Sequence, residues 1–255
     1  MPEPLLQIEG LTKRFGGIVA SDDVTLSIPQ GELHAIIGPN GAGKTTLIGQ
    51  LTGELSSQSG RIRFGGEDIT AQPAHRRSLL GLARSFQITS LFLDFTALDN
   101  VALAVQAHVG HSFRFWRDAR DVRELREPAR AALQRVGLGG RADALVANMS
   151  HGEHRQVEIA MALATRPRML LLDEPMAGMG TDESARMVKL LRELKRELTI
   201  LLIEHDMDAV FALADRISVL VYGRIIATDA PAAIRANPDV RRAYLGEQQA
   251  VMLNG

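Results

Sequence analysis

The sequence contains no cysteine, few aromatic residues and no apolar segment long enough to cross a membrane. Without cysteine, the chain can form neither disulfides nor cysteine-ligated metal sites. A membrane-spanning helix requires about 20 consecutive apolar residues, and the first residues also lack the basic and apolar regions of a signal peptide. Any association with a membrane is therefore expected to depend on a partner protein.

An excess of charge of one sign is also missing. The 29 lysine and arginine residues nearly balance the 30 acidic residues, which leaves a net charge of -1. Nucleic-acid-binding domains usually carry a basic surface, so the whole-chain charge argues against nucleic acid as a partner. The charged stretch 118–136 alternates in sign and predicts a solvent-exposed helix face with ion pairs four residues apart.

The stretch Gly38–Thr45 is the most informative part of the sequence. It reads G-x-x-x-x-G-K-T, follows the apolar run Leu33–Ile37 and precedes a predicted helix over 45–55. This pattern is the P-loop, or Walker A, motif, in which backbone N–H groups and a helix N-terminus hold phosphate oxygens. Lys44 is expected to reach the β- and γ-phosphates of a nucleotide, and Thr45 to offer its hydroxyl to Mg²⁺. The predicted nucleotide-binding residues here are Gly38, Pro39, Asn40, Gly41, Ala42, Gly43, Lys44, Thr45 and Thr46.

Around this loop the residue pattern predicts three kinds of structure. Strands at 5–15, 24–28 and 61–64, with turns at 16–17 and 21–23, predict an antiparallel sheet. Helical periodicity then governs about 73–166, with helices at 97–109, 118–136 and 154–164. Strands at 169–173 and 199–204, separated by a helix at 181–198, predict a parallel sheet. A hairpin at 216–228 and a helix at 231–245 close the chain.

Two later apolar strands end in residues that suit phosphate chemistry. Leu170–Asp173 is followed directly by a second acid, Glu174. In a P-loop fold we expect this strand to lie beside the P-loop strand, so that Asp173 anchors Mg²⁺ in the Walker B role. Glu174 would orient and polarise the attacking water as a general base. The next apolar strand ends at His205, whose imidazole would contact a γ-phosphate or hold the water.

A second helix start carries serine and glycine. Ser150 is a favourable N-cap, and with Gly152 it forms a candidate second anion site. The spacing of His151, His154 and Glu158 also allows a metal site. The phosphate interpretation is preferred, because no further ligands lie nearby in the sequence.

In this order, Gly38–Thr45, Gln87, Ser150–Glu153, Leu170–Glu174 and His205 resemble the nucleotide-binding subunit of ABC transporters. They match that family's Walker A, Q-loop, signature, Walker B and H-switch elements, and the resemblance covers essentially the whole chain. It implies an α/β fold of the P-loop NTPase, ABC ATPase type, with a RecA-like parallel-sheet core, an antiparallel β subdomain and an inserted helical subdomain. The implied single domain spans 5–247, with core and β subdomain in 1–72 and 166–230, helical subdomain in 73–165, and C-terminal helix and tail in 231–255.

The same resemblance implies an ATPase that uses ATP and Mg²⁺ and is coupled to transport. In a head-to-tail dimer, ATP on the P-loop of one subunit would be capped by Ser150 and Gly152 of the other, and Phe15 would stack on adenine. The implied catalytic residues are Glu174, His205 and Lys44, and the implied metal ligands are Thr45, Gln87 and Asp173.

The partners implied by the resemblance are membrane proteins. The Gln87 region and the helices after it would receive an integral-membrane permease. A second ABC ATPase subunit, identical or not, would complete the dimer, and a periplasmic or extracellular solute-binding protein would act indirectly. The chain is then expected at the cytoplasmic face of the inner (plasma) membrane, as a peripheral subunit.

Finer features narrow the resemblance. The segments 14–17, 84–87, 158–160, 173–178, 203–207 and 243–246 look like the LivG-type ATPases of branched-chain amino acid importers, a group that also serves related amino acids, amides and urea. Two segments depart from the ABC pattern. The signature, usually LSGGQ, reads Met149–Glu153 but keeps Ser150 and Gly152, and the loop Ala177–Gly180 lacks the aspartate of the usual S-A-L-D.

The sequence also bears on three alternative functions. A lipopolysaccharide-export ATPase shares the closing segment Tyr244–Glu247, but the long helical region with the aromatic cluster Phe113–Trp116 favours an importer. That cluster is either a small satellite core or a docking surface. A soluble ABC ATPase acting on DNA or ribosomes would be expected to carry coiled-coil, zinc-binding or basic insertions. A GTPase is disfavoured because the sequence has no N-K-x-D motif.

Overall fold

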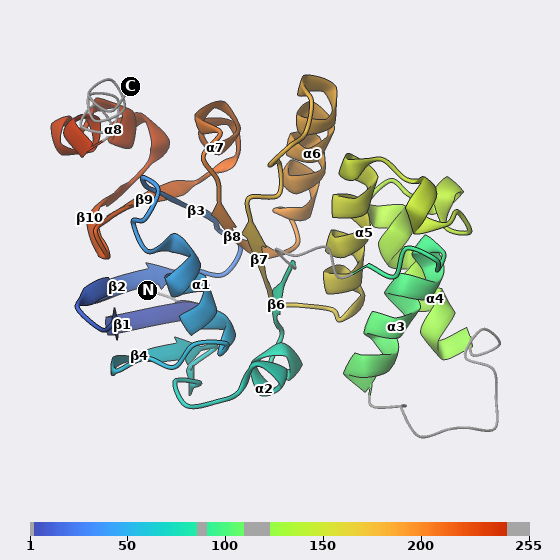
Figure 1. Ribbon diagram of the computed structural model, residues 1–255, viewed down its shortest axis with the longest axis horizontal. Coiled ribbons are helices and arrows are strands. Elements are labelled where there is room, and N and C mark those ends of the chain that lie inside the picture. Colours follow the sequence, from blue (N-terminus) through green and yellow to red (C-terminus); the bar gives the residue numbers. More distant parts are fainter. Residues whose placement is uncertain (1–2, 86–90, 110–122, 244–255) are drawn as a thin grey trace.

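The computed structural model describes residues 3–85, 91–109 and 123–243, which form two β-sheets and surrounding helices (Figure 1). The strands are β1 (Leu6–Phe15), β2 (Ile18–Ile28), β3 (Leu33–Ile37), β4 (Ser59–Phe64), β5 (Glu67–Asp68), β6 (Leu82–Arg84), β7 (Met169–Asp173), β8 (Thr199–Ile203), β9 (Arg216–Val221) and β10 (Arg224–Asp229). The α-helices are α1 (Lys44–Thr52), α2 (Ala74–Leu79), α3 (Ala97–Val109), α4 (Arg123–Arg135), α5 (His151–Ala164), α6 (Thr181–Leu194), α7 (Met207–Leu213) and α8 (Pro231–Ala236). Two short 3-10 helices, η2 (Gly139–Arg141) and η3 (Val146–Asn148), precede α5.

The larger sheet contains the strands that lead into the candidate site. Its order is β10-β9-β3-β8-β7-β6, and all neighbouring pairs are parallel except β9 with β10. Every residue of β3, β7 and β8 is buried, as expected for parallel strands that are covered on both faces. The predicted α/β architecture with a parallel sheet is therefore confirmed.

One prediction about this sheet is wrong. The strand that ends at Asp173 does not lie beside the P-loop strand, because β8 lies between them and pairs with both. The three strands are equally short and equally apolar, so their residue pattern does not indicate which one is central. Since all three are parallel, their carboxyl ends still meet at the same edge of the sheet.

Two hydrophobic cores lie on opposite faces of the larger sheet. On one face, alternate residues of β3, β7, β8 and β9 pack with α1 and with the smaller antiparallel sheet, whose order is β2-β1-β4-β5. On the other face, the intervening residues pack with α5, α6 and α7 and with the helices beyond them. Helix α1, which follows the P-loop, is thus enclosed between two sheets.

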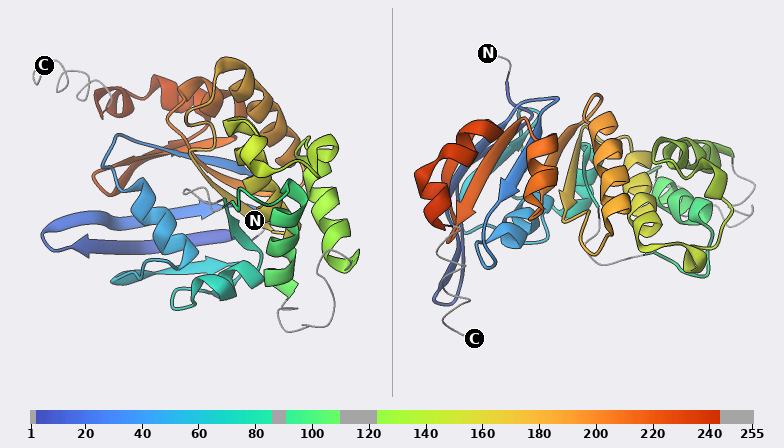
Figure 2. Two further views of the ribbon diagram at one scale, coloured as in Figure 1. Left: turned by 45° about the vertical axis from the view of Figure 1, so that its right-hand side comes forward. Right: turned by 90° about the horizontal axis from the view of Figure 1, so that it is seen from above.

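The helices α3, α4 and α5 pack against one another at one end of the molecule, away from β1, β2 and β4 (Figure 2). The aromatic cluster Phe113–Trp116 and the beginning of the predicted helix 118–136 lie outside the described residues. No helix in the described part of the chain is long and apolar enough to cross a membrane.

Several predicted boundaries require correction. The polar segment Ser21–Asp23 was predicted as a turn, but it belongs to β2, which begins at Ile18. Ser21 is 1% exposed and donates its hydroxyl hydrogen to the Gln50 side chain at 2.6 Å, while Asp23 has a φ of 56° in an irregular part of the β1–β2 pairing. A buried hydrogen bond and a bulge therefore accommodate these polar residues within the strand.

Helix ends also differ from the predicted ones. The predicted closing helix 231–245 is interrupted, because α8 ends at Ala236 and Asn237 has an extended backbone conformation. The following residue, Pro238, favours this conformation because its ring would clash with a helical backbone at Asn237. Helix α1 begins at Lys44 and ends at Thr52, because Gly53 terminates it with a left-handed conformation. Helix α5 begins earlier than predicted, at His151, and α6 ends earlier, at Leu194.

Candidate functional site

The P-loop passes between two backbone segments that leave no room for side chains. A Cβ added at Gly38 would lie 2.0 Å from the carbonyl oxygen of Leu220 in β9, and one at Gly43 would lie 2.1 Å from that of Ala20 in β2. Gly43 also has a φ of 105°, which L-residues rarely adopt. The two glycines thus let the loop contact strands of both sheets, which hold it at the start of α1.

The N-terminus of α1 is left open to an anion. Its N-cap residue, Gly43, makes no side-chain capping bond, and the first turn contains no acidic residue. Lys44 is 9% exposed and folds back over the loop, donating to the carbonyl oxygens of Gly38 at 2.5 Å and Pro39 at 2.9 Å. Uncapped N–H groups, a helix dipole and a lysine at one place suit the phosphates of a nucleotide.

Asp173 lies at the end of β7 and is 4% exposed. Arg84, at the end of β6, donates to Asp173 Oδ2 at 3.2 Å and to the more exposed Glu54 at 2.7 Å. Burial raises the pKa of Asp173, although Arg84 and Lys44 act in the opposite direction. An acid held near two cations, together with the exposed hydroxyl of Thr45, offers the hard oxygen ligands that Mg²⁺ prefers.

Glu174 and His205 lie close together at the carboxyl ends of β7 and β8. Glu174 has a φ of 48°, an unusual value for a residue other than glycine, and its N–H donates to the carbonyl oxygen of Ile203 at 2.8 Å. His205 Nδ1 lies 3.8 Å from Glu174 Oε1, and both side chains are accessible to solvent. A strained backbone conformation at an exposed acid supports a functional role for Glu174.

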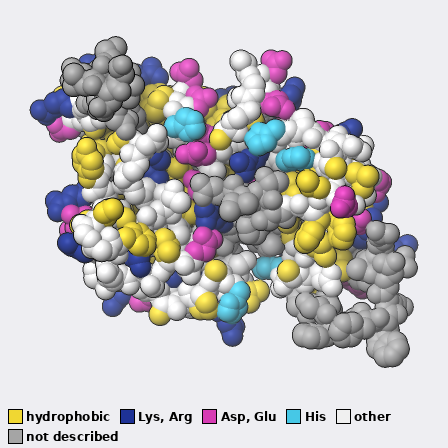
Figure 3. Space-filling view, in the orientation of Figure 1, with side chains coloured by type: hydrophobic (Ala, Val, Ile, Leu, Met, Phe, Trp, Pro, Cys, Tyr) yellow, Lys and Arg dark blue, Asp and Glu magenta, His cyan; other side chains and the backbone are white. Residues whose placement is uncertain are grey.

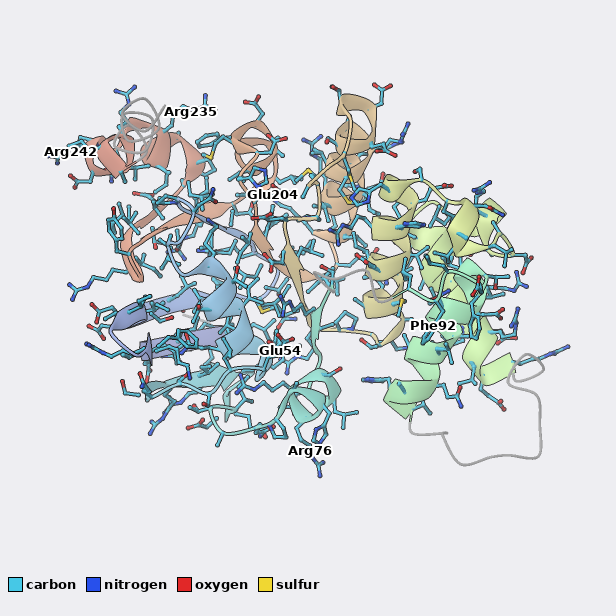
Figure 4. All side chains as sticks on the ribbon, viewed as in Figure 1. Glu54, Arg76, Phe92, Glu204, Arg235 and Arg242 are labelled. Carbon is cyan, nitrogen blue, oxygen red and sulfur yellow. The ribbon has the colours of Figure 1, made fainter. Side chains whose placement is uncertain are left out.

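Glu204, which precedes His205, was not singled out from the sequence. Its side chain is only 1% exposed, and it accepts hydrogen bonds from the N–H groups of Met176, His205 and Asp206. Its position between the ends of β7 and β8 is labelled in Figure 4. Arg84 was likewise not assigned a role. In both cases the available signal was a charged residue at the end of an apolar strand.

The second predicted anion site begins α5. The Ser150 hydroxyl accepts from the Glu153 N–H at 3.3 Å, and Glu153 Oε2 accepts from the Ser150 N–H at 2.8 Å, so the capping box is complete. Ser150 also donates to Glu183 Oε1 at 3.0 Å, and Glu183 lies directly against Gly152. These residues line a cavity of about 290 Å³ between α5, α6 and the 137–141 segment. Within the described residues, no hydrogen bond or ion pair joins Ser150 to the P-loop.

The remaining predicted residues have different environments. Phe15, at the end of β1, is 47% exposed, and the Lys13 ammonium lies 5.3 Å from its ring centroid. Gln87 lies outside the described residues. His151 Nε2 lies 3.1 Å from the Ala177 carbonyl oxygen and His154 Nε2 lies 2.8 Å from that of Val146, so these two rings contact backbone rather than a common metal position.

The exposed face shared by these elements is mixed in character. Histidine, acidic and basic side chains gather over the middle of the face shown in Figure 3, between apolar patches on either side. The arrangement combines an anion cradle, a buried acid with cationic neighbours, and an exposed acid–histidine pair. Together these groups can bind a nucleoside triphosphate and activate a water molecule.

Comparison with known proteins extends this description. The family model described as ABC transporter matches residues 21–177, and the model described as branched-chain amino acid ATP-binding cassette transporter matches residues 224–250. The chain is 41% identical to the high-affinity branched-chain amino acid transport ATP-binding protein BraF of Pseudomonas aeruginosa, over 97% of this chain and 100% of BraF. It is 38% identical to LivG of Escherichia coli K12, with the same coverage.

Solved structures agree with this similarity. A nucleotide-free ATP-binding cassette from an ABC transporter superposes with a TM-score of 0.84 at 30% identity, covering 94% of this chain and 98% of that one. A second solved structure, the ADP conformation of an ATP-binding cassette of an ABC transporter, superposes with a TM-score of 0.85 at 31% identity, covering 95% of this chain and 99% of that one. The predicted ABC ATPase fold is therefore confirmed.

Proposed function

The chain belongs to the ABC transporter family as an ATP-hydrolysing subunit, and from this premise we propose that it powers the uptake of branched-chain amino acids. The observation that carries the proposal is the match of residues 224–250, which contain β10 and α8, to the branched-chain amino acid group. Identity to BraF and LivG over nearly the whole chain supports the same assignment. The family-model match and these identities favour import over lipopolysaccharide export.

The proposed binding residues divide between two subunits. In one chain, Gly38–Thr46 holds the phosphates of ATP and the exposed ring of Phe15 stacks on adenine. Ser150 and Gly152 of a second ABC ATPase subunit complete the site, and the N-terminus of α1, which has no capping side chain of its own, supports this arrangement.

The proposed metal and catalytic residues lie at the ends of neighbouring strands. Thr45, Asp173 and Gln87 would hold Mg²⁺, which when bound neutralises charge on the phosphate oxygens. Glu174 accepts a proton from the attacking water, and His205 lies beside it to hold the water or a phosphate oxygen. Lys44 stabilises negative charge on the transferred phosphoryl group.

The proposed partners follow from the family. An integral-membrane permease binds the Gln87 region and the helices that follow it, and a solute-binding protein outside the membrane delivers the substrate. The chain then lies as a peripheral subunit at the cytoplasmic face of the inner membrane. Purification of the complex tests whether the second ATPase subunit is identical to this chain.

The experiment that tests this function is solute uptake in a strain that lacks the gene. Labelled leucine, a polar amino acid, an amide and urea are supplied separately. We expect selective loss of leucine uptake, restored by the parent gene and not by the Glu174→Gln variant. Loss of amide or urea uptake instead would replace the proposed substrate, and normal uptake of all four would overturn the import function.

A further inference from the structure

Glu204 is a buried acid that has no part in the roles proposed above. Its two carboxylate oxygens accept three backbone hydrogen bonds: Oε1 from the Met176 N–H at 2.9 Å, and Oε2 from the N–H groups of His205 at 2.9 Å and Asp206 at 3.3 Å. These contacts all use N–H donors, which suits an ionised carboxylate because it has no proton to donate. A buried charge is tolerated when it is hydrogen-bonded in this way.

These hydrogen bonds join the two loops that carry the proposed catalytic pair. Met176 lies in the turn that follows β7, two positions after Glu174. His205 follows Glu204 directly at the end of β8. The Glu174 N–H also donates to the carbonyl oxygen of Ile203 at 2.8 Å. Hydrogen bonds therefore connect the ends of β7 and β8 at Ile203 as well as at Glu204. Movement of one loop relative to the other would break at least one of these bonds.

The imidazole of His205 lies near both acids. Its Nδ1 is 3.8 Å from Glu174 Oε1 and 3.9 Å from Glu204 Oε2. The two groups proposed to act on water are exposed, with His205 64% and Glu174 38% exposed, whereas Glu204 is buried. An exposed histidine has many available orientations, and a fixed carboxylate beside Nδ1 favours those in which Nδ1–H faces the acids and Nε2 faces away.

We propose that Glu204 is a positioning residue for ATP hydrolysis, which fixes the Glu174 loop and the His205 ring relative to each other. It does not contact the reacting atoms. The inference rests on the roles proposed above for Glu174 and His205. A purely structural role would instead stabilise the strand ends without acting through the histidine.

The two possibilities are separated by a double-mutant cycle in ATP hydrolysis. Glu204→Gln keeps the side-chain shape but presents an amide N–H₂ to backbone N–H donors, so one oxygen acceptor is lost. We expect kcat to fall about 10- to 100-fold, the range seen when groups that orient catalytic residues are removed. The KM for ATP should change less than about twofold, because the phosphate loop is untouched. In a His205→Ala background, Glu204→Gln should cause no further loss.

Glu197→Gln is the matched control. It is the same substitution just before the opposite end of β8, at an exposed side chain that pairs with Arg135, and it should leave kcat unchanged. If Glu204→Gln does not fold, as judged by circular dichroism, Glu204→Asp is measured instead. It keeps the carboxylate but shortens the reach to the Met176 N–H, and the same dependence on His205 is expected.

Several results would overturn the proposal. An unchanged kcat, an equal loss with and without His205, or unfolding of both Glu204 variants would each leave Glu204 with a structural role only. A His205→Ala chain as active as the parent would remove the role of His205, and this proposal with it. The uptake experiment does not depend on any of these results, so failure of the proposed function would be recognised separately.

Discussion

The two helix N-termini that the sequence marks as anion sites, those of α1 and α5, are built in opposite ways. Helix α1 has a glycine N-cap, no capping side chain and no acid in its first turn. Helix α5 has a complete capping box, and the carboxylate of Glu183 lies against Ser150 and Gly152. The first is open to phosphate as it stands, whereas the second is already satisfied by its own chain. A phosphate that docks on α5 must therefore displace an acid.

The largest effect that this comparison predicts is at α1. Lys44→Ala removes the ammonium that folds over the loop, and ATP affinity should fall roughly 10- to 100-fold, because hydrogen bonds to charged groups contribute about 1.5–3 kcal/mol each. Isothermal titration of the full chain with ATP and Mg²⁺ measures this change. Lys189→Ala, at an exposed lysine of α6, is the control. Unchanged affinity in the Lys44 variant would remove the P-loop assignment.

At α5 the expected loss is in hydrolysis and not in binding. Ser150→Ala removes the hydroxyl proposed to cap the nucleotide of the other subunit, so ATP affinity of the free chain should stay the same while hydrolysis falls about tenfold. The lost N-cap should also lower the free energy of unfolding by about 1 kcal/mol. Titration, steady-state hydrolysis and urea unfolding measure the three quantities. A parallel loss of ATP affinity would mean that α5 acts within its own chain.

A smaller gain is expected when the acid at α5 is neutralised. Glu183→Gln removes the negative charge that lies against Ser150 and Gly152, and ATP-dependent dimerisation should strengthen about two- to fivefold, the scale of an exposed charge interaction. Analytical ultracentrifugation of the hydrolysis-deficient Glu174→Gln chain, with and without the second substitution, measures this. Glu193→Gln on the same helix serves as the control. Weaker dimerisation would instead make Glu183 a support for the signature segment.

The smallest effect concerns Glu158, farther along α5. It is 1% exposed, one of its oxygens has no hydrogen-bond partner within the described residues, and burial raises its pKa despite the Arg155 guanidinium at 2.9 Å. The folded state therefore disfavours the ionised form, and this residue makes the protein less stable as pH rises above the ordinary range of a glutamate.

Glu158→Gln has no such titration. The free energy of unfolding of this variant, relative to that of the parent, should therefore rise as the pH increases above the ordinary pKa of a glutamate, about 4.3. Urea unfolding at several pH values, with Glu193→Gln as the control, measures the trend. The opposite slope would indicate that the Arg155 pair outweighs burial.

The structural positions of candidate site residues that the sequence predicts correctly depend on segments that are local in sequence. Gly38–Thr45 is a continuous motif between a strand and a helix, and its position follows from those residues alone. The positions of Ser150 as the N-cap of α5, and of Asp173, Glu174 and His205 at or just after the ends of apolar strands, follow for the same reason. Residue types that satisfy one turn or one strand end can be recognised without knowing their neighbours in space.

The features that were missed depend on segments far apart in the sequence. The central position of β8 is decided by pairing among three strands with the same pattern. Arg84 contacts Asp173 across 89 positions, Glu204 contacts Met176 across 28, and Ser150 contacts Glu183 across 33. Arg84 ends β6, Glu204 follows β8 and Glu183 lies in the first turn of α6, so the partner of each becomes visible only once the sheet and helices are assembled.

The close contacts of Gly38 and Gly43 have a consequence for inherited variation in this gene. Every missense change at either codon adds a Cβ about 2 Å from a carbonyl oxygen of a strand in one of the two sheets, whatever the chemistry of the new side chain. At Gly41, by contrast, a Cβ would meet no atom within 4 Å, and only its φ of 76° restricts the choice. A saturation mutagenesis screen should therefore return no tolerated substitution at the first two codons. At the third it should favour asparagine and aspartate, the residues that adopt this conformation most readily.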